Sequence, residues 1–200
     1  MRNTHRPFFI LVFRDIWPYM RLMQMTSVTQ NPKITQLIEY LEGLTQRPAL
    51  SEVTQQLESF DITTEELGDY VQFHSSKYQR NLIFQNEHFQ LICLCWKSGQ
   101  KSHIHDHAES SCGIKVVTGI ISETIFERNS EGYIKPVSTT HFGKGVIGSE
   151  DADIHQISNL QGPNEDLVTI HCYAPPLKRM KVFSPDSRYP TEYEPKNDWE

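Results

Sequence analysis

Residues 99–112 of this 200-residue chain read Gly-Gln-Lys-Ser-His-Ile-His-Asp-His-Ala-Glu-Ser-Ser-Cys, with three histidines in five positions, His103, His105 and His107. In a β-strand, side chains two positions apart share a face and lie about 6.6 Å apart along it. Two imidazoles at that spacing can converge on one metal ion, whereas the first and third of the row, about 13 Å apart, cannot. The spacing predicts two metal ligands and one bystander, and leaves open which histidine is the bystander.

A third metal ligand must come from elsewhere in the chain. His155 lies late in the strand-rich region, and His171 shares one face of a predicted strand with Thr169 and Tyr173. A Thr–His–Tyr row is an unusual core face, and it indicates a hydrogen-bonded set in which His171 orients the Tyr173 hydroxyl. Taken alone, a histidine is usually a surface residue or a core residue with satisfied hydrogen bonds.

A polar pair, Tyr78 and Arg80, has the same two-residue spacing where the strand-rich region begins. The guanidinium of arginine is a planar fork that binds a carboxylate through two hydrogen bonds. The pair is therefore a candidate for binding an acidic substrate, and a structural ion pair of Arg80 is the alternative.

The strand-rich region is recognised by apolar residues that alternate with polar ones from residue 80 to residue 174. Glycine-rich turns separate the segments, and the nearly continuous apolar run 89–96 predicts a strand covered on both faces. Many short strands with regular turns are typical of a β-sandwich or a barrel. The predicted strands are 80–85, 88–97, 103–108, 111–118, 120–128, 132–141, 144–148, 153–158 and 166–174.

Before the strands, residues 33–73 have helical spacing of apolar residues and predict a small helical layer. Thr63 and Glu66 have the spacing of a capping box and open its third helix. Residues 1–28 do not resemble part of the domain, and we expect a poorly ordered extension or a mis-assigned start. We expect one domain over residues 29–183 and an extended tail over 184–200, which carries three prolines.

Composition excludes some classes of partner. Lys and Arg number 19 against 25 Asp and Glu, which gives a net charge of −6 and a pI near 5.8. An acidic chain without a basic run argues against nucleic acid or an anionic membrane as the main partner. The four cysteines have no Cys-x-x-Cys spacing, which favours a reducing, cytoplasmic location.

Several motifs together resemble the cupin superfamily and, within it, the type I cysteine dioxygenase family. The first cupin motif is matched by Gly99, His105, His107 and Gly119, with Cys112 where the motif has a glutamate, and the second motif is matched by His155 and Asn159. The dioxygenase hallmarks are present in order as Tyr78-Gln79-Arg80-Asn81-Leu82, Cys95-Trp96, His105-Asp106-His107 and His171-Cys172-Tyr173-Ala174-Pro175-Pro176. The resemblance spans roughly residues 33–182.

The resemblance implies a mostly β fold, a cupin-type, jelly-roll-like antiparallel barrel behind the small helical layer. It also implies an Fe(II)-dependent enzyme that oxidises L-cysteine with O2 to cysteine sulfinate, in the cytoplasm and as a monomer. The implied metal ligands are His105, His107 and His155. Arg80, beside Tyr78, would bind the substrate carboxylate, and Tyr173 would hydrogen-bond the reacting oxygens with His171 behind it.

Some members of that family link a cysteine to the active-site tyrosine through a thioether. Cys112 stands at that cysteine's position, but other members have glycine there and Gly113 is adjacent, so the crosslink to Tyr173 stays open. Two other functions also stay open. One is a dioxygenase for another small thiol such as 3-mercaptopropionate, against which Arg80 argues, and the other is a non-enzymatic metal-binding cupin.

Overall fold

The computed structural model describes residues 31–44, 46–149 and 153–197, so the predicted extension at residues 1–28 lies outside the described part. Within it, helices come first and strands follow. The helices are α2 (Pro32–Glu42), α3 (Leu50–Ser59), α4 (Thr64–Leu67) and the 3-10 turn η2 (Gly68–Tyr70). The strands are β1 (Gln79–Gln85), β2 (Gln90–Trp96), β3 (Ile104–His105), β4 (Ser111–Thr118), β5 (Ile121–Arg128), β6 (Ile134–Phe142), β7 (Gly145–Ser149), β8 (Ile154–Ser158), β9 (Leu167–Ala174), β10 (Met180–Phe183) and β11 (Thr191–Tyr193).

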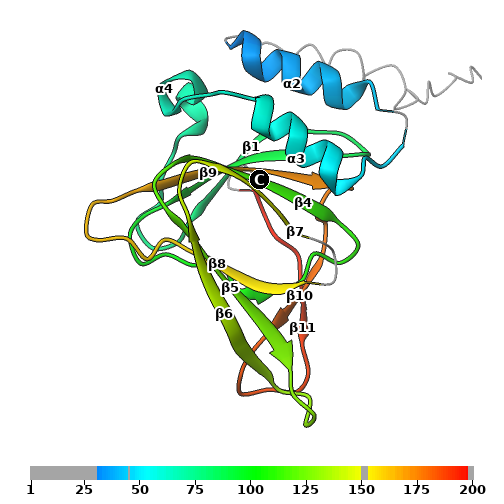
Figure 1. Ribbon diagram of the computed structural model, residues 1–200, viewed down its shortest axis with the longest axis vertical. Coiled ribbons are helices and arrows are strands. Elements are labelled where there is room, and N and C mark those ends of the chain that lie inside the picture. The colour runs from blue at the N-terminus through cyan, green and yellow to red at the C-terminus, as the bar shows by residue number, and fades with distance from the viewer. Residues whose placement is uncertain (1–30, 45, 150–152, 198–200) are drawn as a thin grey trace, which may run out of the picture.

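The helices form where capping residues and apolar spacing agree. Asn31 begins α2 by accepting a hydrogen bond from the Lys33 backbone N–H, and Pro32 supplies a first residue that needs no hydrogen-bond partner. Thr63 and Glu66 form the predicted capping box of α4. The apolar side chains of these helices pack on the outer face of a sheet. Figure 1 shows α2 and α3 on this outer face.

The strands form two antiparallel sheets. One has the order β1-β2-β9-β4-β7, and the other has the order β11-β10-β3-β8-β5-β6. A core cluster containing Trp96 and Ile114 from the first sheet and Ile121 and Ile157 from the second lies between them. The predicted mostly β, jelly-roll-like fold is confirmed, with two facing sheets in place of one closed barrel.

Strand β2 is buried along its whole length, as its apolar sequence predicts. Alternate residues of a strand point to opposite faces, so β2 contributes to two cores. Leu91, Cys93 and Cys95 pack with the helices. Ile92, Leu94 and Trp96 pack between the sheets. The second group belongs to the wall of the interior in which the site lies.

Two glycines permit close approaches that the fold needs. A Cβ on Gly113 would lie 2.8 Å from Val53 Cγ1 and 2.9 Å from Leu57 Cδ1, so β4 can pack against α3 only without a side chain there. Gly119, in the turn between β4 and β5, has φ of +84°, and a Cβ there would lie 2.5 Å from the Asp166 carbonyl oxygen. Because Gly113 faces the helices, its neighbour Cys112 faces the interior.

Two expectations about the strands were wrong. The predicted strand 103–108 is only the two-residue β3, because the chain turns after it and Ala108 and Glu109 have φ of 43° and 76°. The strands do not end at residue 174, since β10 pairs with β3 and with β11, and β11 lies in the segment 184–200 that was expected to be an extended tail. No helix of the described residues is long and apolar enough to cross a membrane.

Candidate metal centre and its cavity

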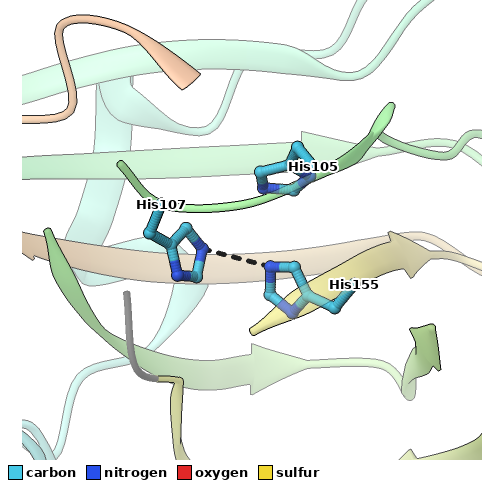
Figure 2. Close-up of side chains that lie close together, drawn as sticks. All are labelled: His105, His107 and His155. Atoms are coloured by element: carbon cyan, nitrogen blue, oxygen red, sulfur yellow. Dashed lines mark hydrogen bonds between the residues drawn. The ribbon is translucent and has the colours of Figure 1, made fainter. Parts of the chain in front are cut away.

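Three buried histidines lie together between the sheets. His105 is in β3, and His155 is directly opposite it in β8. His107 follows the end of β3, so its place is set by the turn and not by a strand. One ring nitrogen from each histidine lies within 4.8 Å of the other two, and Figure 2 shows the three rings facing one another.

Hydrogen bonds to the far side of two rings direct their Nε2 atoms at the shared centre. His105 Nδ1 lies 2.8 Å from the His103 carbonyl oxygen, and His155 Nδ1 lies 2.6 Å from Glu123 Oε1. Since a carbonyl can only accept, His105 Nδ1 carries the proton and Nε2 keeps its lone pair. Burial, followed by the nearby His155 and His107, holds the pKa of His105 well below its usual range, which keeps this ring neutral.

The donor set fits a divalent cation. His155 Nε2 and His107 Nε2 are 3.1 Å apart, a contact that a shared proton or a metal ion must stabilise (Figure 2). Neutral imidazole is the form that binds metal, and three such ligands are typical of catalytic sites that keep an open position. The cluster is the predicted group His105, His107 and His155.

His103 lies outside this cluster. Its side chain is exposed, and its ring makes an edge contact with Tyr193 of β11 at 5.0 Å between centroids. The bystander histidine therefore packs against the C-terminal strand, while its carbonyl orients His105.

The Thr169–His171–Tyr173 row lies on β9 and faces the same interior. Trp96 Nε1, which can only donate, bonds Thr169 Oγ1 at 3.1 Å. Thr169 Oγ1 lies 3.1 Å from His171 Nε2, and His171 Nδ1 lies 3.3 Å from the Tyr173 hydroxyl. Burial lowers the pKa of His171 and raises the pKa of Tyr173, so both groups stay neutral near pH 7.

Cys112 is the cysteine that lies beside Tyr173. The two residues are directly opposite in the β4–β9 ladder, and Cys112 Sγ is also 3.8 Å from His171 Nδ1. Burial raises the pKa of the Cys112 thiol well above its usual value. Gly113 points to α3, so the register of the sheet brings the thiol and not the glycine to the tyrosine.

Arg80 brings a positive charge into the interior from β1. Burial opposes this charge, but the hydroxyls of Tyr173 and Tyr78 outweigh burial and leave the pKa of Arg80 above its ordinary value. Tyr78 itself stacks on Trp96, with ring centroids 4.2 Å apart and planes 17° apart. The guanidinium thus stays charged between two phenols at the metal centre's cavity.

One cavity brings together the three clustered histidines, His171, Tyr173 and Arg80, while Cys112 and Thr169 do not line it. Its lining is partly apolar, from residues such as Leu94 and Met180, and partly polar. A wider cavity of about 730 Å³ adjoins it and shares Tyr78, Arg80 and Ser102. The polar residues that line the smaller cavity are Tyr78, Arg80, Ser102, His105, His107, His155, His171 and Tyr173.

Comparison with known proteins agrees with this geometry. The family model described as Cysteine dioxygenase type I matches residues 23–186. The chain belongs to the cysteine dioxygenase type I family. It is therefore an enzyme of an oxidoreductase family, as its sequence motifs predict.

Curated relatives of this family span most of the chain. The cysteine dioxygenase type 1 of Danio rerio is 28% identical over 169 residues, which is 80% of this chain and 84% of that protein. The cysteine dioxygenase type 1 of Rattus norvegicus and that of Homo sapiens are each 29% identical over 168 residues, with the same shares covered.

Solved structures of other proteins match this chain at lower sequence identity and over a smaller part of its length. The TT1209 protein of Thermus thermophilus has a TM-score of 0.46 at 15% identity, covering 58% of this chain and 98% of that one. A Klebsiella pneumoniae protein with a double-stranded β-helix domain has a TM-score of 0.45 at 17% identity, covering 54% and 80%.

Glu123 is the residue at this site that sequence reasoning missed. It lies on β5, between Ile121 and Ile125 on the inward face of the strand. Its side chain is 12% exposed where it meets His155. An acidic residue at an inward, otherwise apolar strand position is the signal that could have found it.

Proposed function

We propose that this chain is an Fe(II)-dependent cysteine dioxygenase, which adds both atoms of O2 to the sulfur of L-cysteine to give cysteine sulfinate. The observation that carries the proposal is the meeting of a three-histidine cluster, a buried arginine and a buried tyrosine in one cavity. Membership in the family supports the choice of cysteine as the substrate.

His105, His107 and His155 would hold the iron. When bound, Fe(II) would supply the positions at which a thiolate and dioxygen meet. A ligand set without a carboxylate leaves the ion's positive charge uncompensated, which favours an anionic thiolate as a further ligand. The hydrogen bonds of His105 and His155 on their far sides hold both rings in the orientation that this requires.

Arg80 would bind the carboxylate of the substrate. A buried guanidinium forms charge-assisted hydrogen bonds that are stronger than neutral ones, and it fixes orientation when both branches of the fork are used. Tyr78 stacks on Trp96, and its hydroxyl helps to raise the pKa of Arg80 and keep the guanidinium charged. Held in this way, the substrate would present its sulfur at a fixed place in the cavity.

Tyr173 would donate a hydrogen bond to the reacting oxygen atoms. Its raised pKa keeps the proton on the phenol, so the group acts as a donor. His171 and Thr169 limit the positions that the hydroxyl can take, and Trp96 fixes Thr169 in turn. Leu94, Leu177 and Met180 form an apolar wall that limits water around the reacting atoms.

The proposal extends to the setting of the enzyme. All four cysteines are free and buried, which suits a reducing compartment, and we propose a cytoplasmic monomer with residues 29–183 as one catalytic domain. The proposed partners are small molecules, L-cysteine and O2, with neither nucleic acid nor a membrane involved.

Oxygen uptake by the iron-loaded protein tests the proposal. Reconstituted protein should consume O2 with L-cysteine and yield a sulfinate that carries two labelled oxygens when ¹⁸O2 is supplied. Faster turnover of 3-mercaptopropionate than of cysteine would assign the other thiol substrate. Iron binding without uptake for any small thiol would leave a metal-binding protein and overturn the enzymatic proposal.

A further inference from the structure

Two of the three candidate ligands, His105 and His155, differ in the group that their Nδ1 atom contacts. His105 donates its Nδ1 proton to a neutral backbone carbonyl, that of His103. His155 meets a carboxylate, with Glu123 Oε1 2.6 Å from its Nδ1. The two side chains are 1% and 12% exposed, so water screens their interaction little.

The sheet builds this contact. In the β5–β8 ladder His155 is opposite Ile125 and Glu123 is opposite Ile157. Glu123 and His155 are thus diagonal neighbours on one face of the sheet, a separation that a glutamate side chain can span. Both residues sit in strands of the six-stranded sheet, so their relative position is rigid.

A carboxylate in this place does two things to the histidine. It keeps the proton on Nδ1, so that Nε2 points its lone pair at the centre, and its negative charge makes the imidazole a stronger electron donor. It also places negative charge beside a site whose three candidate ligands are all histidines.

We propose that Glu123 is a positioning residue that fixes the tautomer of His155 and strengthens its bond to the metal. This rests on the metal centre of the proposed function and not on its substrate. Glu123 touches neither substrate nor metal in this assignment, and acts through His155.

Metal affinity measured without any thiol tests the proposal. We would determine dissociation constants for Co²⁺ and, without oxygen, for Fe²⁺ by competition with a chelator in the full-length protein. Glu123→Ala should weaken both by about 10- to 100-fold. Glu123→Gln keeps an acceptor for Nδ1–H but loses the charge, and should show a smaller loss in the same direction. Glu127→Gln, an exposed glutamate on the same strand, is the matched control and should bind as the wild type does.

A second readout separates positioning from support of the fold. In the zinc-loaded protein, nitrogen NMR shifts of the His155 ring should report a proton on Nδ1, and Glu123→Ala should move these shifts. A structural role would lower the unfolding temperature of the metal-free variants and leave metal affinity unchanged. Should Glu123→Ala fail to fold, the near-isosteric Glu123→Gln still decides the question.

Dissociation constants of the variants within about twofold of wild type would overturn the proposal. This outcome is distinct from failure of the proposed function. If the variants bind metal more weakly but the wild type oxidises no cysteine, the role of Glu123 stands and the proposed function is wrong. If the wild type oxidises cysteine but the variants bind metal as tightly as it does, the proposed function stands and the role of Glu123 is wrong.

Discussion

Single alanine substitutions should distinguish the three buried histidines, which are the proposed metal ligands, from the exposed His103. His105→Ala, His107→Ala and His155→Ala each remove one of the ring nitrogens that converge within 4.8 Å, so we expect loss of most bound iron and of oxygen uptake. His103→Ala removes only an exposed ring against Tyr193 and should leave both largely intact. Iron content per chain by elemental analysis is the measurement. An inactive His103→Ala beside an active His107→Ala would contradict the assignment.

Arg80 should separate substrates by their carboxylate. A buried charge-assisted contact contributes about 1.5–3 kcal/mol, which is on the order of 10- to 100-fold in kcat/KM. Arg80→Gln should reduce activity on L-cysteine by about this factor, and Arg80→Lys should not restore it fully because lysine lacks the fork. Cysteamine, which has no carboxylate, should be a poor substrate and should lose little. Equal losses for both thiols would instead assign Arg80 to the fold.

Cys112 and Tyr173 are placed for a covalent link. With O2 as the oxidant, turnover would join Cys112 Sγ to the ring of Tyr173 with loss of two hydrogens, because the two residues are directly opposite in the ladder. Intact mass spectra after repeated turnover should show the linked species. Cys112→Ala should lack it and keep part of the activity. A fully active protein without any such species would show that the bond does not form here.

At the scale of elements, the packing of α3 on β4 depends on Gly113. In Gly113→Ala the new methyl would meet Val53 Cγ1 at 2.8 Å, and a valine side chain on a helix cannot easily move aside. We expect a loss of about 1–3 kcal/mol in the free energy of unfolding, measured with urea. The control is Gly143→Ala, where a Cβ meets nothing within 4 Å. Equal stability of the two variants would mean that α3 adjusts freely.

The elements differ in how far the sequence predicts them. Apolar alternation and turn glycines locate most of the strands, and capping residues locate the start of α4. Strands β3, β10 and β11 are only two to four residues long. Such short segments carry too few residues for a period to be recognised. They form because neighbouring strands offer hydrogen-bond partners, and those neighbours are set by the tertiary fold and not by the local sequence.

For the whole molecule, stability should depend on pH through buried His171. Burial and then Arg80 hold its pKa well below the ordinary 6.5, so near neutral pH it is uncharged in both the folded and the unfolded chain. Below about pH 6.5, His171 takes up a proton in the unfolded chain but not in the folded chain. Through this group the free energy of unfolding falls by up to about 1.4 kcal/mol per pH unit. The loss should continue until the pH reaches the lowered folded pKa.

Urea unfolding of metal-free protein from about pH 7.5 to pH 5 measures this effect. In His171→Gln the group is absent, so the difference in unfolding free energy between wild type and variant should shrink as the pH falls. A constant difference across this range would contradict a buried neutral histidine. The comparison with the variant removes the contributions of the other histidines.

For the site as a whole, the sequence predicts which residues take part better than it predicts which side chains contact one another. Spacing and motif order bring forward His105, His107 and His155 as ligand candidates, with Arg80 and Tyr173 beside them. The contact of Glu123 with His155 depends on the register of β5 against β8, and the sequence does not contain that register. The same holds for Cys112, whose position opposite Tyr173 depends on which face of β4 meets α3.

The burial of every cysteine has a chemical consequence for an enzyme that handles free thiols. Disulfide exchange begins when a thiolate attacks an accessible sulfur, and Cys93, Cys95, Cys112 and Cys172 are all shielded. Burial also raises the pKa of Cys172 to about 12, which keeps its nucleophilic form scarce. We therefore expect the protein to form no mixed disulfides with cysteine or cystine in solution, so its own thiols do not react with its substrate.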